Sequence, residues 1–444
     1  MNVLRLLPLT SAIGLAIGFA FAPAAQAENL LELYQSARAF DATWQSARSQ
    51  YDANLARAAQ AKAGVLPTAG LTAGYSKTDL EVTAPVINRK FRTESAAINA
   101  SQPLYRPANW ATYEQGLKQV DIAGAQLQAA EQDLVLRVSQ SYFDVLAAQD
   151  TLAFVRAQKS AVAEQLASAK RNFEVGTSTI TDTREAQARY DLVIAQEIAG
   201  ENDLRVKRLA LDTLVGKTDA QPNALVIPSV LPRPLPDDVN AWVTLAEDAS
   251  PSIAQARLAV DVAQLETKKA EAGHKPTLDL TASYGVTRSP EGNQTVGVAT
   301  RTQNTTMGLA FNLPLFAGFA TQNRIKETLS LEEKSRADLE AARRAVAQNT
   351  RAAFFGVQSG LGQVKALEAA EASSQSALDA NKLGYQVGVR INIDVLNSQS
   401  QLFQTKRDLA QARYNVLLGN LKLRLANGSL KPEDLFDVNA VLSR

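Results

Sequence analysis

The sequence of 444 residues contains no cysteine and a single histidine, His274. Without cysteine the chain has no disulfide, no thiol nucleophile and no site for an N-terminal cysteine-linked lipid. One histidine is too few for a His-rich metal centre or a conventional catalytic triad, and at a helix-to-strand junction we expect it to be structural. The sequence shows no nucleophile paired with a base and no phosphate loop, so we expect a protein that is not an enzyme and uses no metal or other cofactor.

Long apolar runs are also scarce. Only the start of the chain has one: Arg5 is followed by an apolar run over 6–21 and by the small-residue motif Ala25-Gln26-Ala27. This pattern is typical of a secretory signal peptide over residues 1–27, the alternative being a true membrane helix. No later run reaches the ~18 residues that a transmembrane helix needs. The net charge of +1 gives no indication of nucleic-acid binding. We therefore expect an exported protein that is either soluble or a β-barrel.

The rest of the chain contains two copies of an internal sequence repeat. FEVGTSTITDTREAQ (173–187) and YQVGVRINIDVLNSQ (385–399) share an aromatic residue, a Val-Gly pair and an Asp six positions after the glycine. Their glycines are 388 − 176 = 212 positions apart. PTAGLTAGY (67–75) returns as PTLDLTASY (276–284) at an offset of 276 − 67 = 209, and QPLY (102–105) returns as LPLF (313–316) at 314 − 103 = 211. Three anchors in one order at nearly one offset indicate an internal duplication.

Two stretches without proline, 108–221 and 315–431, are rich in the strong helix formers Ala, Gln, Leu, Glu, Lys and Arg. Apolar residues recur in them at helical spacing, with many alanines that allow close helix packing. A helix over 108–172 would be roughly 100 Å long, too long for a compact domain, which favours coiled-coil-like packing. Further helices are expected at about 30–64 and 240–273.

Strands are expected between the helical blocks. Apolar and polar residues alternate over 278–287 and 307–315, and more weakly over 68–77 and 96–105. Polar loops over 77–93 and 289–305 would join each pair into a hairpin. Strands of about ten residues have the length that a tilted membrane strand needs.

Each half is thus a helix, a hairpin and two long helices joined by a turn. The first repeat spans 28–216 and the second 239–444, with a stiff linker over 217–238 that holds five prolines. Four strands with an apolar face would leave unpaired edges in lipid, so they must close with copies of themselves. Two copies would make an eight-stranded barrel and three a twelve-stranded one, and physics alone does not choose. A soluble sheet half-buried on the helices is the alternative.

With its signal peptide, duplicated layout, paired strand motifs and VGxxxxxxD turns, the mature chain resembles the TolC family of outer-membrane channel-tunnels over essentially its whole length. The resemblance implies an α+β membrane protein: a homotrimer with a twelve-stranded barrel in outer-membrane lipid, four strands coming from each chain, continuous with a long α-helical tunnel through the periplasm. It further implies an exit duct for type I protein secretion, drug efflux or both, working with a periplasmic adaptor and an inner-membrane ABC or proton-driven pump. A trimeric helical stalk or adhesin is the competing hypothesis.

In that family the repeated turns lie at the periplasmic tip, where the channel closes. Gly176 and Gly388 can end a long helix in the left-handed conformation, which places Asp182 and Asp394 in the first turn of the returning helices. A capping role and a gating role are both open for each Asp, and Thr179 with Asp182 fits a capping box. The residues that match the polar links of the family's closed tip are Thr181, Asp182, Tyr385 and Arg390.

For Arg390, a link between helices is favoured over a pair with Asp394 on its own helix, where an Arg preceding an Asp is the weaker orientation. The family's constriction is lined by two rings of Asp, of which Asp394 matches the first. Asn397 stands at the second, so a trimer would carry three carboxylates there and not six. We therefore expect a channel that prefers cations and is blocked by multivalent cations more weakly than the pattern of two Asp rings implies.

Overall fold

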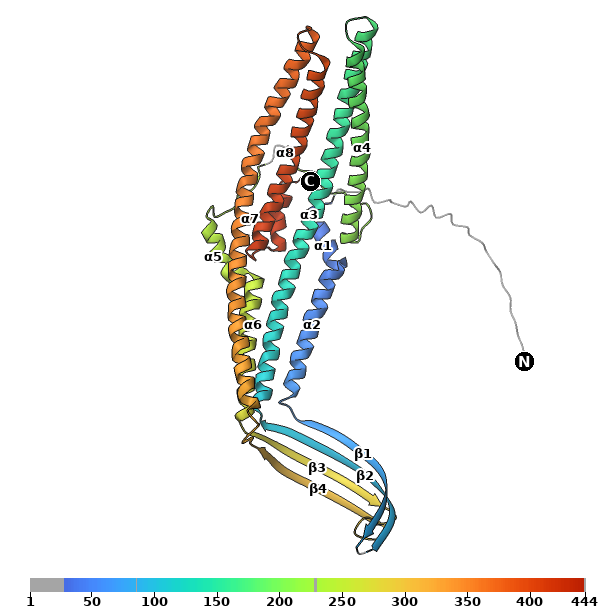
Figure 1. Ribbon diagram of the computed structural model, residues 1–444, viewed down its shortest axis with the longest axis vertical. Coiled ribbons are helices and arrows are strands. Elements are labelled where there is room, and N and C mark those ends of the chain that lie inside the picture. Colours follow the sequence, from blue (N-terminus) through green and yellow to red (C-terminus); the bar gives the residue numbers. More distant parts are fainter. Residues whose placement is uncertain (1–27, 85, 227–229, 443–444) are drawn as a thin grey trace, which may run out of the picture.

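The computed structural model describes residues 28–84, 86–226 and 230–442, so the expected signal peptide at 1–27 lies outside the described residues. The chain is a long rod with a β-sheet at one end and two helical tips at the other (Figure 1). No helix among the described residues is long and apolar enough to cross a membrane. Nor do these residues contain a group of three or more His, Asp or Glu side chains placed to hold a metal ion.

The helices and strands follow the duplicated order that the sequence predicts. The first repeat contains α1 (Leu30–Phe40), α2 (Ala42–Ala63), β1 (Thr68–Thr83), β2 (Val86–Tyr105), α3 (Pro107–Glu174) and α4 (Ile180–Val215). The second contains α5 (Val239–Ala249), α6 (Pro251–Glu271), η1 (Ala272–His274), β3 (Thr277–Ser289), β4 (Thr300–Asn312), α7 (Ala320–Gln386), α8 (Asn392–Ala426), η2 (Pro432–Asp434) and α9 (Leu435–Asn439).

The helix that precedes each hairpin is broken, which the sequence analysis missed. Asp41 ends α1 and caps α2 with extended backbone angles, and its side chain accepts a hydrogen bond from the Trp44 N–H. Ser250 separates α5 from α6 with similar extended backbone angles but without a side-chain cap hydrogen bond, because Pro251 follows it and disfavours helical geometry in the residue before it. The two breaks are 250 − 41 = 209 positions apart, so they belong to the duplication.

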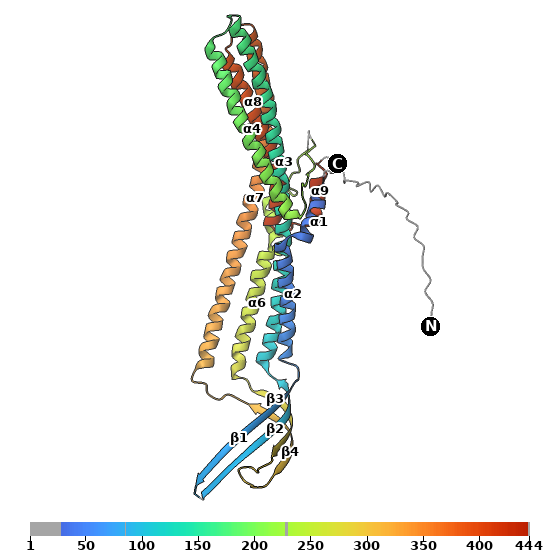
Figure 2. The same ribbon diagram turned by 90° about the vertical axis from the view of Figure 1, so that its right-hand side faces the viewer.

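The long helices α3 and α7 have 68 and 67 residues and are therefore about 100 Å long, as predicted. Near the sheet they lie in a curved wall in the order α2, α3, α6, α7 (Figure 2). Towards the tips the wall continues as two antiparallel hairpins, α3 with α4 and α7 with α8, which meet where α3 contacts α8.

The sheet is antiparallel in the order β1-β2-β3-β4. Its strands have 16, 20, 13 and 13 residues, so the expected length of about ten was too short. The predicted polar loop at 77–93 is wrong: β1 and β2 stay paired to Thr83 and Val86, and cross-strand ion pairs such as Lys90–Asp79 at 2.7 Å accommodate the charges. The second loop is shorter than expected, and β4 ends at Asn312, before Pro314.

The predicted alternation puts apolar side chains on one face of the sheet. The register pairs Leu71 with Ile98 and Ile98 with Tyr284, so these three lie in one row across the strands. Their side chains are 74, 54 and 47% exposed in the single chain. An apolar face this open has the character of a surface that meets lipid or a neighbouring copy.

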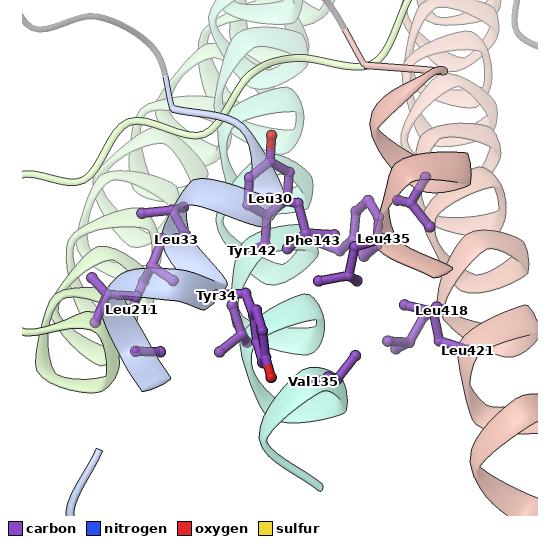
Figure 3. Close-up of a cluster of buried hydrophobic side chains, with 14 of the residues drawn as sticks. Leu30, Leu33, Tyr34, Val135, Tyr142, Phe143, Leu211, Leu418, Leu421 and Leu435 are labelled. Carbon is purple, nitrogen blue, oxygen red and sulfur yellow. The ribbon is translucent and has the colours of Figure 1, made fainter. Parts of the chain in front are cut away.

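The main hydrophobic core lies midway along the rod, away from both ends. It joins α1, α3, α4, α8 and α9, which are far apart in the sequence (Figure 3). Tyr142 of α3 is completely buried, and its hydroxyl donates to the carbonyl of Asn223 in the linker at 2.9 Å. This core therefore fastens the linker and the last helix of the chain to the middle of the long helices.

Candidate functional site: the helical tips

Both turns at the tips have the same backbone. Gly176 follows α3 with φ +79° and Gly388 follows α7 with φ +82°, which confirms the predicted left-handed helix ends. The next N–H reaches back five residues in each turn, from Thr177 to the Asn172 carbonyl at 2.8 Å and from Val389 to the Gly384 carbonyl at 2.9 Å. The duplication thus builds two equivalent helical hairpins.

Asp182 is held at its own helix start. Its carboxylate accepts hydrogen bonds from the Thr179 N–H, the Thr179 hydroxyl and the Ser178 hydroxyl at 2.9–3.0 Å, all through Oδ2. The Asp182 N–H donates back to the Thr179 hydroxyl oxygen, so the predicted capping box is confirmed. Partial burial alone would raise the pKa of Asp182, but these hydrogen bonds outweigh it and hold the pKa below its ordinary value. The group is a stable carboxylate, and the hydrogen bonds that it accepts among the described residues all reach Oδ2 and none reaches Oδ1.

Asp394 is different, although it stands at the equivalent position. The residue that caps α8 is Ile391, whose side chain cannot hold a carboxylate. Asp394 instead lies 3.7 Å from the guanidinium of Arg390, the pair that the sequence analysis held to be the less favoured one. The aliphatic part of Arg390 packs on Gly384, where an added Cβ would lie 2.6 Å from Cγ of the arginine. Gly384 therefore lets Arg390 fold back onto the end of α7.

A cleft of about 840 Å³ lies between the two tips and is lined by four of the eight predicted site residues. It is lined by Asp182, Tyr385, Gly388 and Arg390, together with residues that the sequence analysis did not single out. The Tyr385 hydroxyl accepts a hydrogen bond from Asn172 of α3 at 3.1 Å, which links the two hairpins. Thr181 is exposed and does not line the cleft.

Among the described residues of one protomer, Tyr385 and Arg390 form no hydrogen bond with the Asp182 carboxylate. Links from these residues to a neighbouring copy stay a prediction, as does the lining of a constriction by Asp394 and Asn397. The geometry of the single chain favours a capping role for Asp182 and places Asp394 in an ion pair with Arg390, outside the lining of the cleft.

Three polar contacts between the hairpins were missed. Asn392, at the start of α8, accepts from Gln165 of α3 and donates to the Asp182 carbonyl of α4 at 3.2 Å. Arg189 of α4 donates to the Asn397 Oδ1 at 3.0 Å. One feature of the sequence could have pointed to Asn392. At the repeat offset of 212 positions it corresponds to Ile180, so an asparagine replaces an apolar residue within the repeat.

Comparisons with known proteins agree with this architecture. The family described as "Outer membrane efflux protein" matches residues 33–217 and 242–429, one segment in each repeat. Outer membrane protein TolC of Vibrio cholerae is 35% identical over 99% of this chain and 98% of that protein. The Proteases secretion protein PrtF of Dickeya chrysanthemi is 30% identical over 94% of this chain and 91% of that protein.

The fold is also similar to solved structures. The crystal structure of the CmeC outer membrane channel of Campylobacter jejuni covers 100% of this chain and 98% of its own, with a TM-score of 0.79. Its sequence is only 15% identical, so this likeness concerns the fold. The whole rod, from sheet to tips, is therefore shared with an outer-membrane channel.

Proposed function

This chain belongs to the outer membrane efflux protein family, and on that basis we propose that its two helical tips form the periplasmic gate of an export duct. The protein is an exit duct of the outer membrane, for protein secretion, drug efflux or both. It has the fold of a trimeric channel, in which three four-stranded sheets close a twelve-stranded barrel and the helices continue it as a tunnel.

The open edges of the sheet are the observation that most directly supports an export duct. Strands β1 and β4 each have one neighbour, so each leaves a row of backbone donors and acceptors at an edge. In a lipid environment every such group must be paired, because an unpaired one costs several kcal/mol. Joining β4 of one copy to β1 of the next satisfies both edges and turns the apolar row of Leu71, Ile98 and Tyr284 towards lipid.

The tips supply the gate in this proposal. Tyr385 and Arg390 border the cleft between the hairpins, which is also lined by the capped Asp182. In the trimer, the hairpin of one copy approaches that of the next, where charge-assisted hydrogen bonds can form and be broken again. Such links favour a closed tip and still allow a partner to open it.

The same tips are the surface that we propose for a periplasmic adaptor. Both turns expose apolar side chains at the end of the rod. They are Val175, Ile180, Val387, Val389 and Ile391, between 49 and 76% exposed. Clustered apolar groups on a polar surface mark a protein-binding site. An adaptor seated here would connect the duct to an inner-membrane pump, either an ABC transporter or a proton-driven one, and the pump would select the cargo.

Single-channel current in a planar bilayer tests the gate. The variant Tyr385→Phe/Arg390→Ser removes the phenol hydroxyl and the guanidinium, and we expect its conductance to rise several-fold above a small, cation-preferring wild-type current. The control Tyr113→Phe/Arg336→Ser makes the same chemical changes on α3 and α7 away from the tips and should conduct as wild type. Unchanged current in the tip variant would refute the gate and leave the pore intact.

A further inference from the structure

The two hairpins of one protomer are joined at the tip by side chains whose role the proposed gate does not yet include. Asn392 makes two of these contacts, one to each helix of the α3/α4 hairpin: it accepts from the Gln165 amide of α3 and donates to the Asp182 carbonyl of α4 at 3.2 Å. A backbone carbonyl can only accept, so the amide nitrogen of Asn392 faces Asp182 and its oxygen is left for Gln165. Both ends of the carboxamide are thus in use.

The burial of Asn392 is unusual for its place in the fold. It is the first residue of α8, beside a solvent-exposed turn, yet its exposed fraction is 0%. Asparagine near a helix start ordinarily serves as a cap for its own helix. Here Ile391 occupies the cap position, and the Asn392 side chain reaches across to the other hairpin instead.

A comparison of the two repeats shows that the cap residue and the residue after it differ in character between the two turns. In the first repeat Thr179 caps the helix and Ile180 follows it with 49% of its surface exposed. In the second repeat the equivalent pair is Ile391, 61% exposed, and the buried Asn392. An apolar residue outside and an amide inside is the reverse of what burial energetics favours, unless the amide is needed for its hydrogen bonds.

We infer that Asn392 is a gating residue: its buried carboxamide clasps the α7/α8 hairpin to the α3/α4 hairpin of the same protomer, and the tip opens only when this clasp separates. The inference rests on the proposed gate at the tips. Separating the hairpins would leave a buried amide and its partners without hydrogen bonds until water reaches them, and this penalty favours the closed tip. The clasp acts within each protomer, so it is distinct from links between neighbouring copies.

A neighbouring contact provides a matched control. Asn381 of α7 donates to the Ser398 hydroxyl of α8, which joins the two helices of a single hairpin. When one hairpin moves as a body away from the other, this hydrogen bond stays intact. Removing it should therefore leave the closed state unchanged.

Single-channel currents of the full-length trimer test the clasp. Asn392→Leu and Gln165→Met keep side-chain size and remove the hydrogen bond from opposite sides. We expect a several-fold higher conductance in both, and wild-type conductance in Asn381→Leu. Wild-type conductance in Gln165→Met and in any folded Asn392→Leu trimer would overturn the inference.

A second measurement separates a clasp from a general loosening of the tip. Because the chain has no cysteine, Gln165→Cys/Asn392→Cys can be linked selectively by a short bis-methanethiosulfonate, whose two disulfides are reducible and which reacts when opening of the tip exposes the buried position. We expect low conductance while the link is present and a several-fold rise after reduction, with no change on reduction in the control Asn381→Cys/Ser398→Cys. A linked channel that conducts as freely as the reduced one would overturn the clasp. If wild type and every tip variant carry no current at all, the duct itself is refuted, an outcome that differs from failure of the clasp alone.

Discussion

The charge at the expected constriction depends on a contact that the sequence does not reveal. Asn397 stands where the family pattern has a second ring of aspartates, so Asn397→Asp should restore a ring of three carboxylates in the trimer. The structure places the guanidinium of Arg189 at 3.0 Å from Asn397 Oδ1. An aspartate at this position would pair with that arginine, so the variant holds an ion pair where the wild type holds a positive charge beside a neutral amide.

The magnitude follows from Coulomb's law. A carboxylate and a trivalent cation roughly 8 Å apart interact by about 1.6 kcal/mol in water. Screening in 0.1 M salt, where the Debye length is about 10 Å, lowers this to about 0.7 kcal/mol. Three carboxylates would then add about 2 kcal/mol, or about 30-fold in blocking affinity. Because Coulomb energies add, this increment is the same with Arg189 or Gln at position 189, and removal of the arginine charge at a similar distance adds a comparable increment of its own.

The assay is block of the single-channel current by hexaamminecobalt(III), an inert trivalent cation, added on the side of the helical tips. We expect about 30-fold tighter block for Asn397→Asp, a comparable gain for Arg189→Gln alone, and roughly the product of the two gains for Asn397→Asp/Arg189→Gln. If Arg189→Gln left block unchanged, Arg189 would not lie beside this position in the working channel. If even the double variant left block unchanged, residue 397 would not line the constriction.

Three further predictions concern stability. Thr179→Ala removes the hydroxyl of the capping box and should weaken the start of α4 by about 1 kcal/mol, seen as faster amide hydrogen exchange in its first turn; unchanged exchange would refute the cap. Gly428→Ala should lower the melting temperature in detergent by several degrees, because φ at this residue is +79° and the new Cβ would lie 2.4 Å from Cα of Ser250. The control Gly362→Ala should not lower it, because a Cβ there would have no atom within 4 Å outside its own helix backbone. Burial raises the pKa of Asp150 above its ordinary 3.8 in spite of the hydrogen bond from Tyr414. The ionised form therefore costs stability at neutral pH, and this cost disappears as the pH falls through the raised pKa towards 3.8. Asp150→Asn should accordingly raise the melting temperature at pH 7–8 by an amount that shrinks in acid, and an equal gain at all pH values would contradict the assignment.

Much of this protein was determined by local sequence patterns. The duplication, the long helices, the apolar face of the sheet and the left-handed turns at Gly176 and Gly388 were predicted because each depends on residues close together in the chain. The capping box of Thr179 and Asp182 is local for the same reason. The extended strands at 78–83 and 86–93 were missed because polar residues there pair with one another across the hairpin, and the sequence pattern alone resembles a loop.

The tertiary structure decided what the tips can do. Two residues at equivalent positions of the repeat, Asp182 and Asp394, differ because one is held by its own cap and the other faces Arg390. The contacts of Asn392 with Gln165 and of Arg189 with Asn397 join residues 227 and 208 positions apart. The periodicity of the sequence does not predict such contacts, since they arise only when two hairpins from distant parts of the chain lie side by side. Local patterns thus determined the elements and their order, whereas the hydrogen bonds and charges between the hairpins came from packing over long sequence distances.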